Sequence, residues 1–215
     1  AQASRYQTNI PTYPMKPVSE IVAAAQQAEA NGAQRFCIVT SGQALSEAEF
    51  QTALTAIKMI KKKTKLKRCA SLGQLSKERA YRLKEAGLNR YHHNIETAPS
   101  FFSQICTTHS FATKLETIKH LKAAGIETCV GGILNLGEKP AQRVEMAFTL
   151  KKINPVSVPI NFLNPRPGTP LANRPLISAL EAVKYLAIFR LILPNAYIRL
   201  AGGRLETFKN SQDLP

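Results

Sequence analysis

A chain of 215 residues, 44% of them hydrophobic and 20% charged, with a mean hydropathy of −0.16, is long enough to bury a sizeable core and too apolar for a disordered protein. None of its apolar stretches approaches the roughly 20 residues that span a bilayer, so we expect no membrane segment. The 29 basic residues outnumber the 14 acidic ones, and the resulting net charge of +15 suits an anionic partner.

Short β-rich runs alternate with amphipathic stretches along the whole chain. Glycines after helices, a capping box at Ser46 and Glu49, and prolines at helix starts mark the boundaries. In chain order we predict a helix over Ser19–Asn31, a strand over Arg35–Thr40, a helix from Ser46 to about Lys63, a strand over Leu66–Leu72, a helix over Ser76–Ala86, a strand over Asn89–Asn94, a helix over Ser110–Ala124, a strand over Ile126–Ile133, a helix starting at Pro140, a strand over Val156–Leu163, a helix starting at Pro175 and a strand over Ala196–Ala201.

Six strands that alternate with helices without a break predict parallel pairing and right-handed crossovers. We therefore expect one continuous α/β domain over residues 1–215, either a (β/α) TIM-type barrel or a doubly wound sheet. Ala1–Arg5 has neither an initiator Met nor an apolar leader, and Lys209–Pro215 is a polar end that caps nothing, so the chain is expected to be a piece of a longer protein.

The densest basic run lies between Lys58 and Arg68, with the sequence KMIKKKTKLKR. It contains no aromatic residue on which a base could stack. It also lies where a helix is predicted to end, and Lys and Arg there complement the helix dipole. We interpret the run as a solvated helix terminus, which makes nucleic acid an unlikely partner.

Polar side chains recur on successive predicted strands, at intervals of 25 to 38 residues, which is about one βα unit. They would meet in one lumen if the sheet closes into a barrel, where functional residues gather at the carboxyl ends of the strands. Thiolates suit iron–sulfur clusters, whereas Asn and Glu suit ribose hydroxyls or a urea. These candidate residues are Cys37, Cys69, Asn94, Glu96, Cys129, Asn161 and Arg199.

Plainer interpretations apply to several of these residues. A single strand cysteine is usually an inert small hydrophobe, and Cys106, out of step with the strand series, is excluded from the site on that basis. His92 and His93 point to opposite faces of a strand, so we expect structural roles for them. A purely structural role is harder to assign to Arg199, because a buried guanidinium without a counter-charge is rarely tolerated. The wide spacing of the four cysteines argues against a zinc ribbon and suggests a reducing cytoplasm.

Several motifs together resemble the biotin synthase family of the radical S-adenosylmethionine (radical SAM) superfamily, in order and in spacing. The resemblance covers nearly the whole chain. It implies a (β/α) TIM-type barrel of the radical SAM kind. The motifs are SRYQT at 4–8, RFCIV at 35–39, AGLNRYHHNIE at 86–96, CVGGI at 129–133, SVPINFL at 157–163, GTPL at 168–171 and YIRLAGGR at 197–204.

The resemblance also implies the cofactors and their ligands. Cys37, Cys69, Cys129 and Arg199 would hold a [2Fe-2S] cluster; the assignment of arginine rests on the family alone, because a guanidinium is normally only a donor. A [4Fe-4S] cluster and S-adenosylmethionine would lie at one end of the barrel. The implied residues for substrate and cofactor binding are Asn94 and Asn161 for the ureido group or the nucleoside, Glu96 for ribose hydroxyls, Lys114 for the S-adenosylmethionine carboxylate, and Ile133.

The implied reaction is sulfur insertion into dethiobiotin, the last step of biotin synthesis. A 5′-deoxyadenosyl radical removes hydrogen from an unactivated carbon, which then takes sulfur from the [2Fe-2S] cluster, so the cofactors carry the hard step. The implied partners are dethiobiotin, an electron donor such as flavodoxin or ferredoxin, and a second copy in a homodimer. The implied location is the cytoplasm.

The sequence departs from the family's pattern in several places. The C-x-x-x-C-x-x-C motif for the radical-generating cluster would end just before Ala1, and the last barrel strand would follow Pro215, so we expect the piece as given to be inactive. Lys114 stands where the family has an arginine, which keeps the charge but loses bidentate geometry. Asn135 replaces a glycine, and Ala3 replaces a serine.

Two alternatives stay open at this point. One is another radical SAM enzyme on the same barrel, such as a maturase or a lysine mutase, which need not keep the three strand cysteines with the arginine. The other is a non-catalytic basic binding protein, suggested by the net charge of +15 and the missing motif. Phosphate contacts would make RNA affinity fall steeply with salt, so a salt titration separates the second alternative from an enzyme.

Overall fold

The computed structural model describes residues 6, 8 and 10–215. The chain divides into two compact units. Residues 11–93 and 115–128 form the first, called here the β1–β3 unit. Residues 1–10, 94–114 and 129–215 belong to the second, called the β5–β7 unit. The departure at Ala3 and part of the motif at 4–8 lie outside the described residues.

The β1–β3 unit is a parallel α/β layer. Its strands pair in the order β1, β2, β3, with Cys37 opposite Cys69 and Ala70 opposite Tyr91. After β3 the chain enters the other unit, which holds α4 (Pro99–Ile105), and it returns within α5. It leaves the β1–β3 unit again in β4, after Thr128. The elements are α1 (Val18–Ala30), β1 (Arg35–Val39), α2 (Glu47–Lys63), β2 (Lys67–Ser71), α3 (Lys77–Glu85), β3 (Arg90–His92), α5 (Phe111–Ala123) and β4 (Glu127–Cys129).

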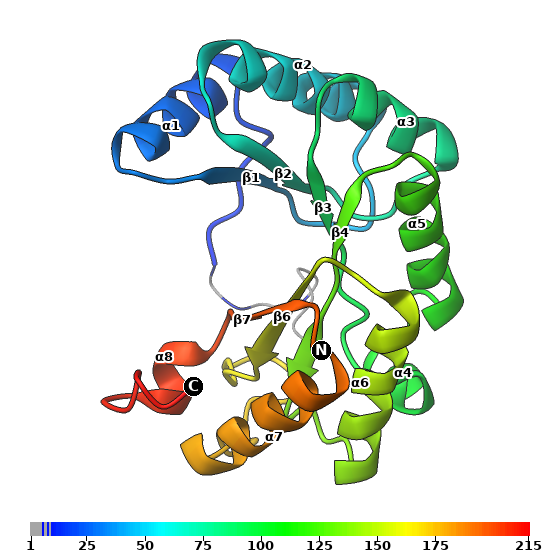
Figure 1. Cartoon of the computed structure of the whole chain (residues 1–215), viewed down its shortest axis with the longest axis vertical. Helices are drawn as coiled ribbons and strands as arrows, with labels where there is room; N and C mark the ends of the chain where they lie inside the picture. Colours follow the sequence, from blue (N-terminus) through cyan, green and yellow to red (C-terminus); the bar gives the residue numbers. More distant parts are fainter. Residues whose placement is uncertain (1–5, 7, 9) are drawn as a thin grey trace. The chain divides into compact units, whose positions relative to one another are not determined.

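One face of these three strands is covered by α1, α2 and α3 (Figure 1). Ile38, Ala70 and Tyr91 point to that face and are buried with the apolar residues of the helices. The predicted capping box begins α2, because the Ser46 hydroxyl accepts from the Glu49 backbone N–H while the Glu49 carboxylate accepts from the Ser46 backbone N–H. The helix ends in three lysines, as expected for a basic helix terminus.

In the β5–β7 unit, β6 is the central strand. It pairs in parallel with β5 and β7, and Ser157 at its start lies opposite Cys129 of β4. Ile160 is the register partner of Gly132, whose Cβ position faces the sulfur of Met146 in α6, so Val158, Ile160 and Phe162, all buried, lie on the helix side of β6. Figure 1 shows α6 and α7 beside β6. The elements are α4 (Pro99–Ile105), β5 (Gly132–Leu134), α6 (Pro140–Ile153), β6 (Ser157–Phe162), α7 (Ala179–Ile192), β7 (Tyr197–Leu200) and α8 (Arg204–Phe208).

Two predicted boundaries were wrong. The single strand expected over Ile126–Ile133 is two short strands, β4 and β5, which pair with successive parts of β6. The described residues therefore form seven strands instead of the six expected. The helix expected from Pro175 begins at Ala179, because the Ser178 hydroxyl caps it by accepting from the backbone N–H of Glu181.

The most apolar of the longer helices is α7, which has 14 residues and buries Ala182, Tyr185 and Phe189 against the β5–β7 unit. Its length is well below the roughly 20 residues that a membrane-crossing helix needs. Among the residues that the structure describes, no helix is both long enough and apolar enough to cross a membrane.

Candidate functional site

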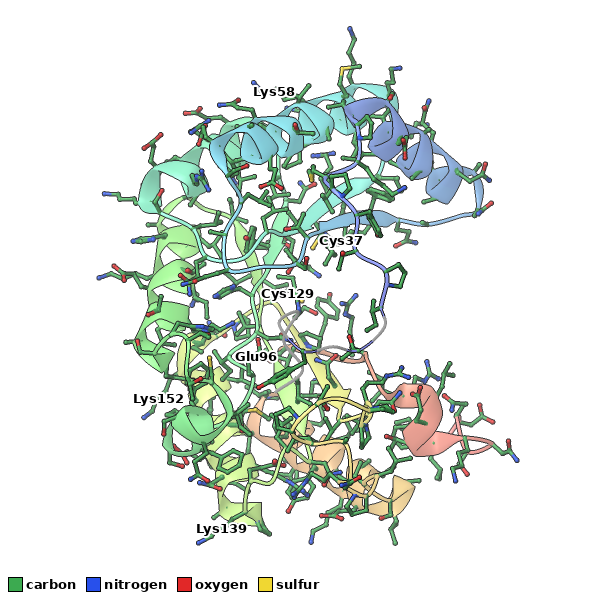
Figure 2. The ribbon with its side chains drawn as sticks, turned by 180° about the vertical axis from the view of Figure 1, so that it is seen from behind. Cys37, Lys58, Glu96, Cys129, Lys139 and Lys152 are labelled. Atoms are coloured by element: carbon green, nitrogen blue, oxygen red, sulfur yellow. The ribbon has the colours of Figure 1, made fainter. Side chains whose placement is uncertain are left out.

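Two of the predicted cluster thiols are neighbours in the β1–β3 unit. Cys37 of β1 and Cys69 of β2 are register partners, so their Cα atoms lie side by side on adjacent strands. Side chains alternate along a strand, and Ile38 and Ala70 point toward the helices, so the two thiols share the opposite face. Cys69 is buried and Cys37, labelled in Figure 2, is exposed.

The other two predicted cluster ligands share a face in the β5–β7 unit. Cys129 lies opposite Ser157, and Arg199 lies opposite Pro159, two residues further along β6. Residues 157 and 159 alternate with Val158, whose side chain is buried on the helix side. Cys129 and Arg199 therefore point away from the helices, with Cys129 buried and Arg199 exposed.

The predicted amides, Asn94 and Asn161, both bind the backbone of the glycine pair at 131–132. The Asn94 Oδ1 accepts from the N–H of Gly131 at 3.0 Å, and the Asn161 Nδ2 donates to the carbonyl of Gly132 at 3.1 Å. Asn161 is also the register partner of Ile133. The structure thus brings together three of the predicted binding residues around one short segment.

The carboxylate of Glu96 forms an ion pair with Lys114. Its Oε1 lies 3.2 Å from the Lys114 Nζ, and the side chains are 32% and 11% exposed, respectively. The backbone carbonyl of Glu96 accepts from the N–H of Ile133 at 2.7 Å, beside the bridge between Glu96 and Gly132. Figure 2 shows Glu96 and Cys129 among the strands of this unit. Glu96 has a left-handed φ of 68°, so its carboxylate is carried by an uncommon backbone conformation.

Close approach of the backbone explains why residues 131 and 132 are both glycine. A Cβ atom on Gly131 would lie 1.8 Å from the carbonyl oxygen of Pro159, and one on Gly132 would lie 2.7 Å from the carbonyl oxygen of Glu96. Real Cβ atoms do not approach backbone oxygen so closely, so only glycine lets β5 and its entry segment lie against β6 and Glu96.

A buried ionic network in the turn after β5 was not predicted from the sequence. The Glu138 carboxylate accepts from the backbone N–H groups of Asn135 and Gly137 and from the Arg143 Nε, at 2.7, 3.0 and 2.6 Å. Arg143 also donates to Glu181 at 2.6 Å. Burial lowers the pKa of Arg143, but its hydrogen bonds to the two carboxylates outweigh burial and raise it. The network therefore fixes the turn that follows β5.

Asn135 occupies a conformation that favours glycine. Its φ is 75°, and among non-glycine residues Asn tolerates the left-handed region best. Its side chain gains a partner that glycine would lack, since the Asn135 Nδ2 donates to the carbonyl of Pro175 at 2.7 Å. The departure that the resemblance implies at this position is thus compatible with the turn.

We expect Asn135→Gly to change the free energy of unfolding by less than about 1 kcal/mol, because relief of the left-handed strain offsets the lost hydrogen bond. Asn135→Ala loses the same bond and keeps the strain, so it should lower the free energy by about 2–3 kcal/mol. Urea unfolding followed by circular dichroism measures both. Equal destabilisation by the two variants would show that the conformation at this position carries no cost.

The convergence of all four predicted cluster ligands stays a prediction. Cys37 and Cys69 lie in one unit, and Cys129 and Arg199 lie in the other. Within the described part of the chain, no three His, Cys, Asp or Glu side chains are grouped closely enough to hold a metal ion. Cys106 follows α4 in a loop outside the strand series, as its position in the sequence indicated.

The sequence matches two family descriptions. Residues 3–150 match the radical SAM superfamily, and residues 159–215 match the biotin and thiamin synthesis associated domain. Curated relatives named biotin synthase are similar over the whole chain. The one from Pelotomaculum thermopropionicum is 50% identical over 100% of this chain and 67% of its own length. The one from Acetivibrio thermocellus is 46% identical over 95% of this chain and 64% of its own length. The chain thus spans about two thirds of the length of these relatives.

Solved structures share the fold. Methylornithine synthase (PylB) has a TM-score of 0.79 at 17% identity, covering 98% of this chain and 61% of the other. The FeFe-hydrogenase maturase HydG from Carboxydothermus hydrogenoformans has a TM-score of 0.76 at 20% identity, covering 89% of this chain and 47% of the other. Together with the parallel pairing, these likenesses confirm an α/β fold of the radical SAM kind, a partial TIM-type barrel.

Proposed function

This chain belongs to the biotin synthase family of the radical SAM superfamily, and from that premise we propose that it serves sulfur insertion into dethiobiotin, the last step of biotin synthesis. The observation that carries the proposal is the placement of Cys37, Cys69 and Cys129, each on the strand face that points away from the packed helices. A barrel strand normally presents Val, Ile or Leu there, so thiols on that face need a chemical reason.

We propose that Cys37, Cys69, Cys129 and Arg199 hold a [2Fe-2S] cluster. The donor set suits iron, because thiolate is the soft ligand that iron–sulfur clusters require. The register pairing of Cys37 with Cys69 supports this assignment, since it puts two thiols on neighbouring strands of one face. The assignment of Arg199 rests on the family and on its position on the same face as Cys129.

S-adenosylmethionine is proposed to bind around Glu96 and Lys114, with Ile133, Asn94 and Asn161 lining the site for the nucleoside or for the ureido group of dethiobiotin. The Lys114 ammonium is paired with Glu96 in the structure. A ligand carboxylate would take over the ammonium and release the Glu96 carboxylate to accept from ribose hydroxyls. Lys114 would hold that carboxylate as a point charge, without the two parallel bonds that an arginine makes.

The bound clusters and S-adenosylmethionine supply radical formation and the sulfur atom, and the residues of this chain bind and orient them. The [4Fe-4S] cluster needs thiolates beyond the four cysteines of this chain, none of which lie in a C-x-x-x-C-x-x-C spacing. We further propose that residues 1–215 act as a single domain, with flavodoxin or ferredoxin as electron donor, in a homodimer in the cytoplasm.

Anaerobic reconstitution of the chain with iron and sulfide tests the ligand set. We expect visible absorption typical of a [2Fe-2S] cluster, which Cys37→Ala, Cys69→Ala and Cys129→Ala each reduce by more than about five-fold, because thiolate donors hold the iron. Cys106→Ala is the matched control and should leave the absorption unchanged. Circular dichroism establishes that each variant is folded.

Two results would contradict the proposal. If Cys106→Ala abolished the absorption as completely as the other three variants, the strand positions would have no special role. If the folded chain bound no iron, and a longer protein containing it bound none either, the assignment of the four ligands would be wrong.

A further inference from the structure

The loop between α4 and α5 holds a thiol, a hydroxyl and an imidazole in mutual contact. The Cys106 Sγ lies 3.4 Å from the His109 Nδ1 and 3.5 Å from the Thr108 Oγ1. The Thr108 Oγ1 lies 3.0 Å from the same imidazole nitrogen. These three side chains have no part in the function proposed above.

His109 is held in place by aromatic packing. Its ring lies edge-on to Phe102, with ring centroids 5.7 Å apart, and Phe102 packs in the same way on Phe111 at 5.4 Å. Phe102 is buried, so it forms a fixed support. The imidazole therefore faces Cys106 from an ordered position, while Cys106 itself is half-buried and within reach of small reagents.

The surroundings favour the thiolate of Cys106. Burial raises its pKa, but hydrogen bonds from the Thr108 side chain and from the backbone N–H groups of Thr108 and His109, with the positive charge of Lys114, outweigh burial and lower the pKa overall. Burial lowers the pKa of His109, and Lys114 lowers it further, so the imidazole is neutral near pH 7 and able to accept a proton. A thiol beside a neutral imidazole has the geometry of an activated nucleophile.

We propose that Cys106 is a thiol-exchange site that forms mixed disulfides with small disulfides such as glutathione disulfide, with His109 as the proton acceptor. The Cys106 sulfur attacks one sulfur of the reagent, so that one sulfur–sulfur bond forms as another breaks. The second half of the reagent leaves as a thiolate, and the Cys106 proton passes to His109 and then to solvent. The exchange needs no further oxidant or reductant.

Reaction with 5,5′-dithiobis(2-nitrobenzoate) under anaerobic conditions, without iron, tests the proposal independently of any cluster or turnover. We expect a fast phase of one thiol, which Cys106→Ser removes and Cys37→Ser retains; Cys37 is the matched control because it is the exposed cysteine. His109→Asn should slow the fast phase by at least about five-fold at pH 7, because the side chain that takes the Cys106 proton is lost, while the Thr108 and backbone hydrogen bonds and the Lys114 charge that lower the thiol pKa remain.

Mapping by mass spectrometry extends the test to the unmutated chain. After brief treatment with limiting glutathione disulfide, Cys106 should carry more of the adduct than any other cysteine. A fast phase that survives in Cys106→Ser, an unchanged rate in His109→Asn, or an adduct mainly on another cysteine would overturn the proposal.

Discussion

Gly131→Ala is expected to prevent the β5–β7 unit from folding, or to lower the free energy of unfolding by more than about 4 kcal/mol. The new Cβ atom would lie 1.8 Å from the carbonyl oxygen of Pro159 and 2.8 Å from its carbonyl carbon. Both atoms belong to the backbone of β6, the central strand, which cannot shift without breaking its pairing with β5 and β7. The substitution also displaces the N–H of residue 131, which donates a hydrogen bond to the Asn94 Oδ1.

Gly32→Ala is the matched control for this prediction. Gly32 has a φ of +83°, and a Cβ atom there would meet nothing within 4 Å. Its substitution should cost only about 1–2 kcal/mol of left-handed strain. Urea unfolding compares the two variants, and a Gly131→Ala protein as stable as Gly32→Ala would show that β6 yields to the extra atom.

Glu138→Ala should lower the free energy of unfolding by about 3–5 kcal/mol, because it leaves the Nε of the buried Arg143 and the N–H groups of Asn135 and Gly137 without their acceptor. The side chains of Glu138 and Arg143 are only 2% and 6% exposed, so water does not replace the carboxylate. The loss should also loosen the turn that contains Asn135 and Gly137, whose N–H groups bind Glu138. Chemical denaturation and hydrogen exchange at these two amides measure the effects.

Glu181→Ala removes the other carboxylate that Arg143 binds and serves as the control. Glu181 is 47% exposed, so water takes its place and the expected loss is about 1 kcal/mol or less. Similar losses for the two variants would contradict the view that burial makes Glu138 the dominant partner.

Local signals predicted most of the fold. The Ser46 capping box, Pro140 at the start of α6 and the glycines that end α1 and α3 act within a few residues, and the structure has helix boundaries close to each. The break between β4 and β5 was missed, although Gly131 lies in it, because the residues on either side of the glycine pair were interpreted as one β-rich run. Only the pairing with β6 shows it. The start of α7 was predicted at Pro175, which is too early, because the side chain of Ser178, three residues later, caps the helix.

The candidate site could be predicted residue by residue but not as a network. Strand position was enough to select Asn161 and Glu96, whereas their partners are the backbone of Gly132 and the side chain of Lys114. The Glu138 network was missed because a single glutamate in a turn looks like a surface residue, and because Glu181, the second carboxylate on Arg143, is distant in the sequence. A Glu that follows a glycine-containing turn, with an Arg one helical turn into the next helix, is the signal that was available.

Asn161 is turned in a fixed direction before any ligand arrives. Its Nδ2 donates to the carbonyl of Gly132, and its Oδ1 accepts from the N–H of Gly202. An amide group has two N–H bonds and two lone pairs, so one of each is left over among the hydrogen bonds of the described residues. That remaining pair has the same pattern as the edge of a urea, where a carbonyl and an N–H lie together. A ligand that approaches the wrong way round would meet donor with donor and acceptor with acceptor. The rotational freedom of this side chain is already lost during folding. Recognition of a ureido ring in one orientation would therefore need no further ordering of Asn161.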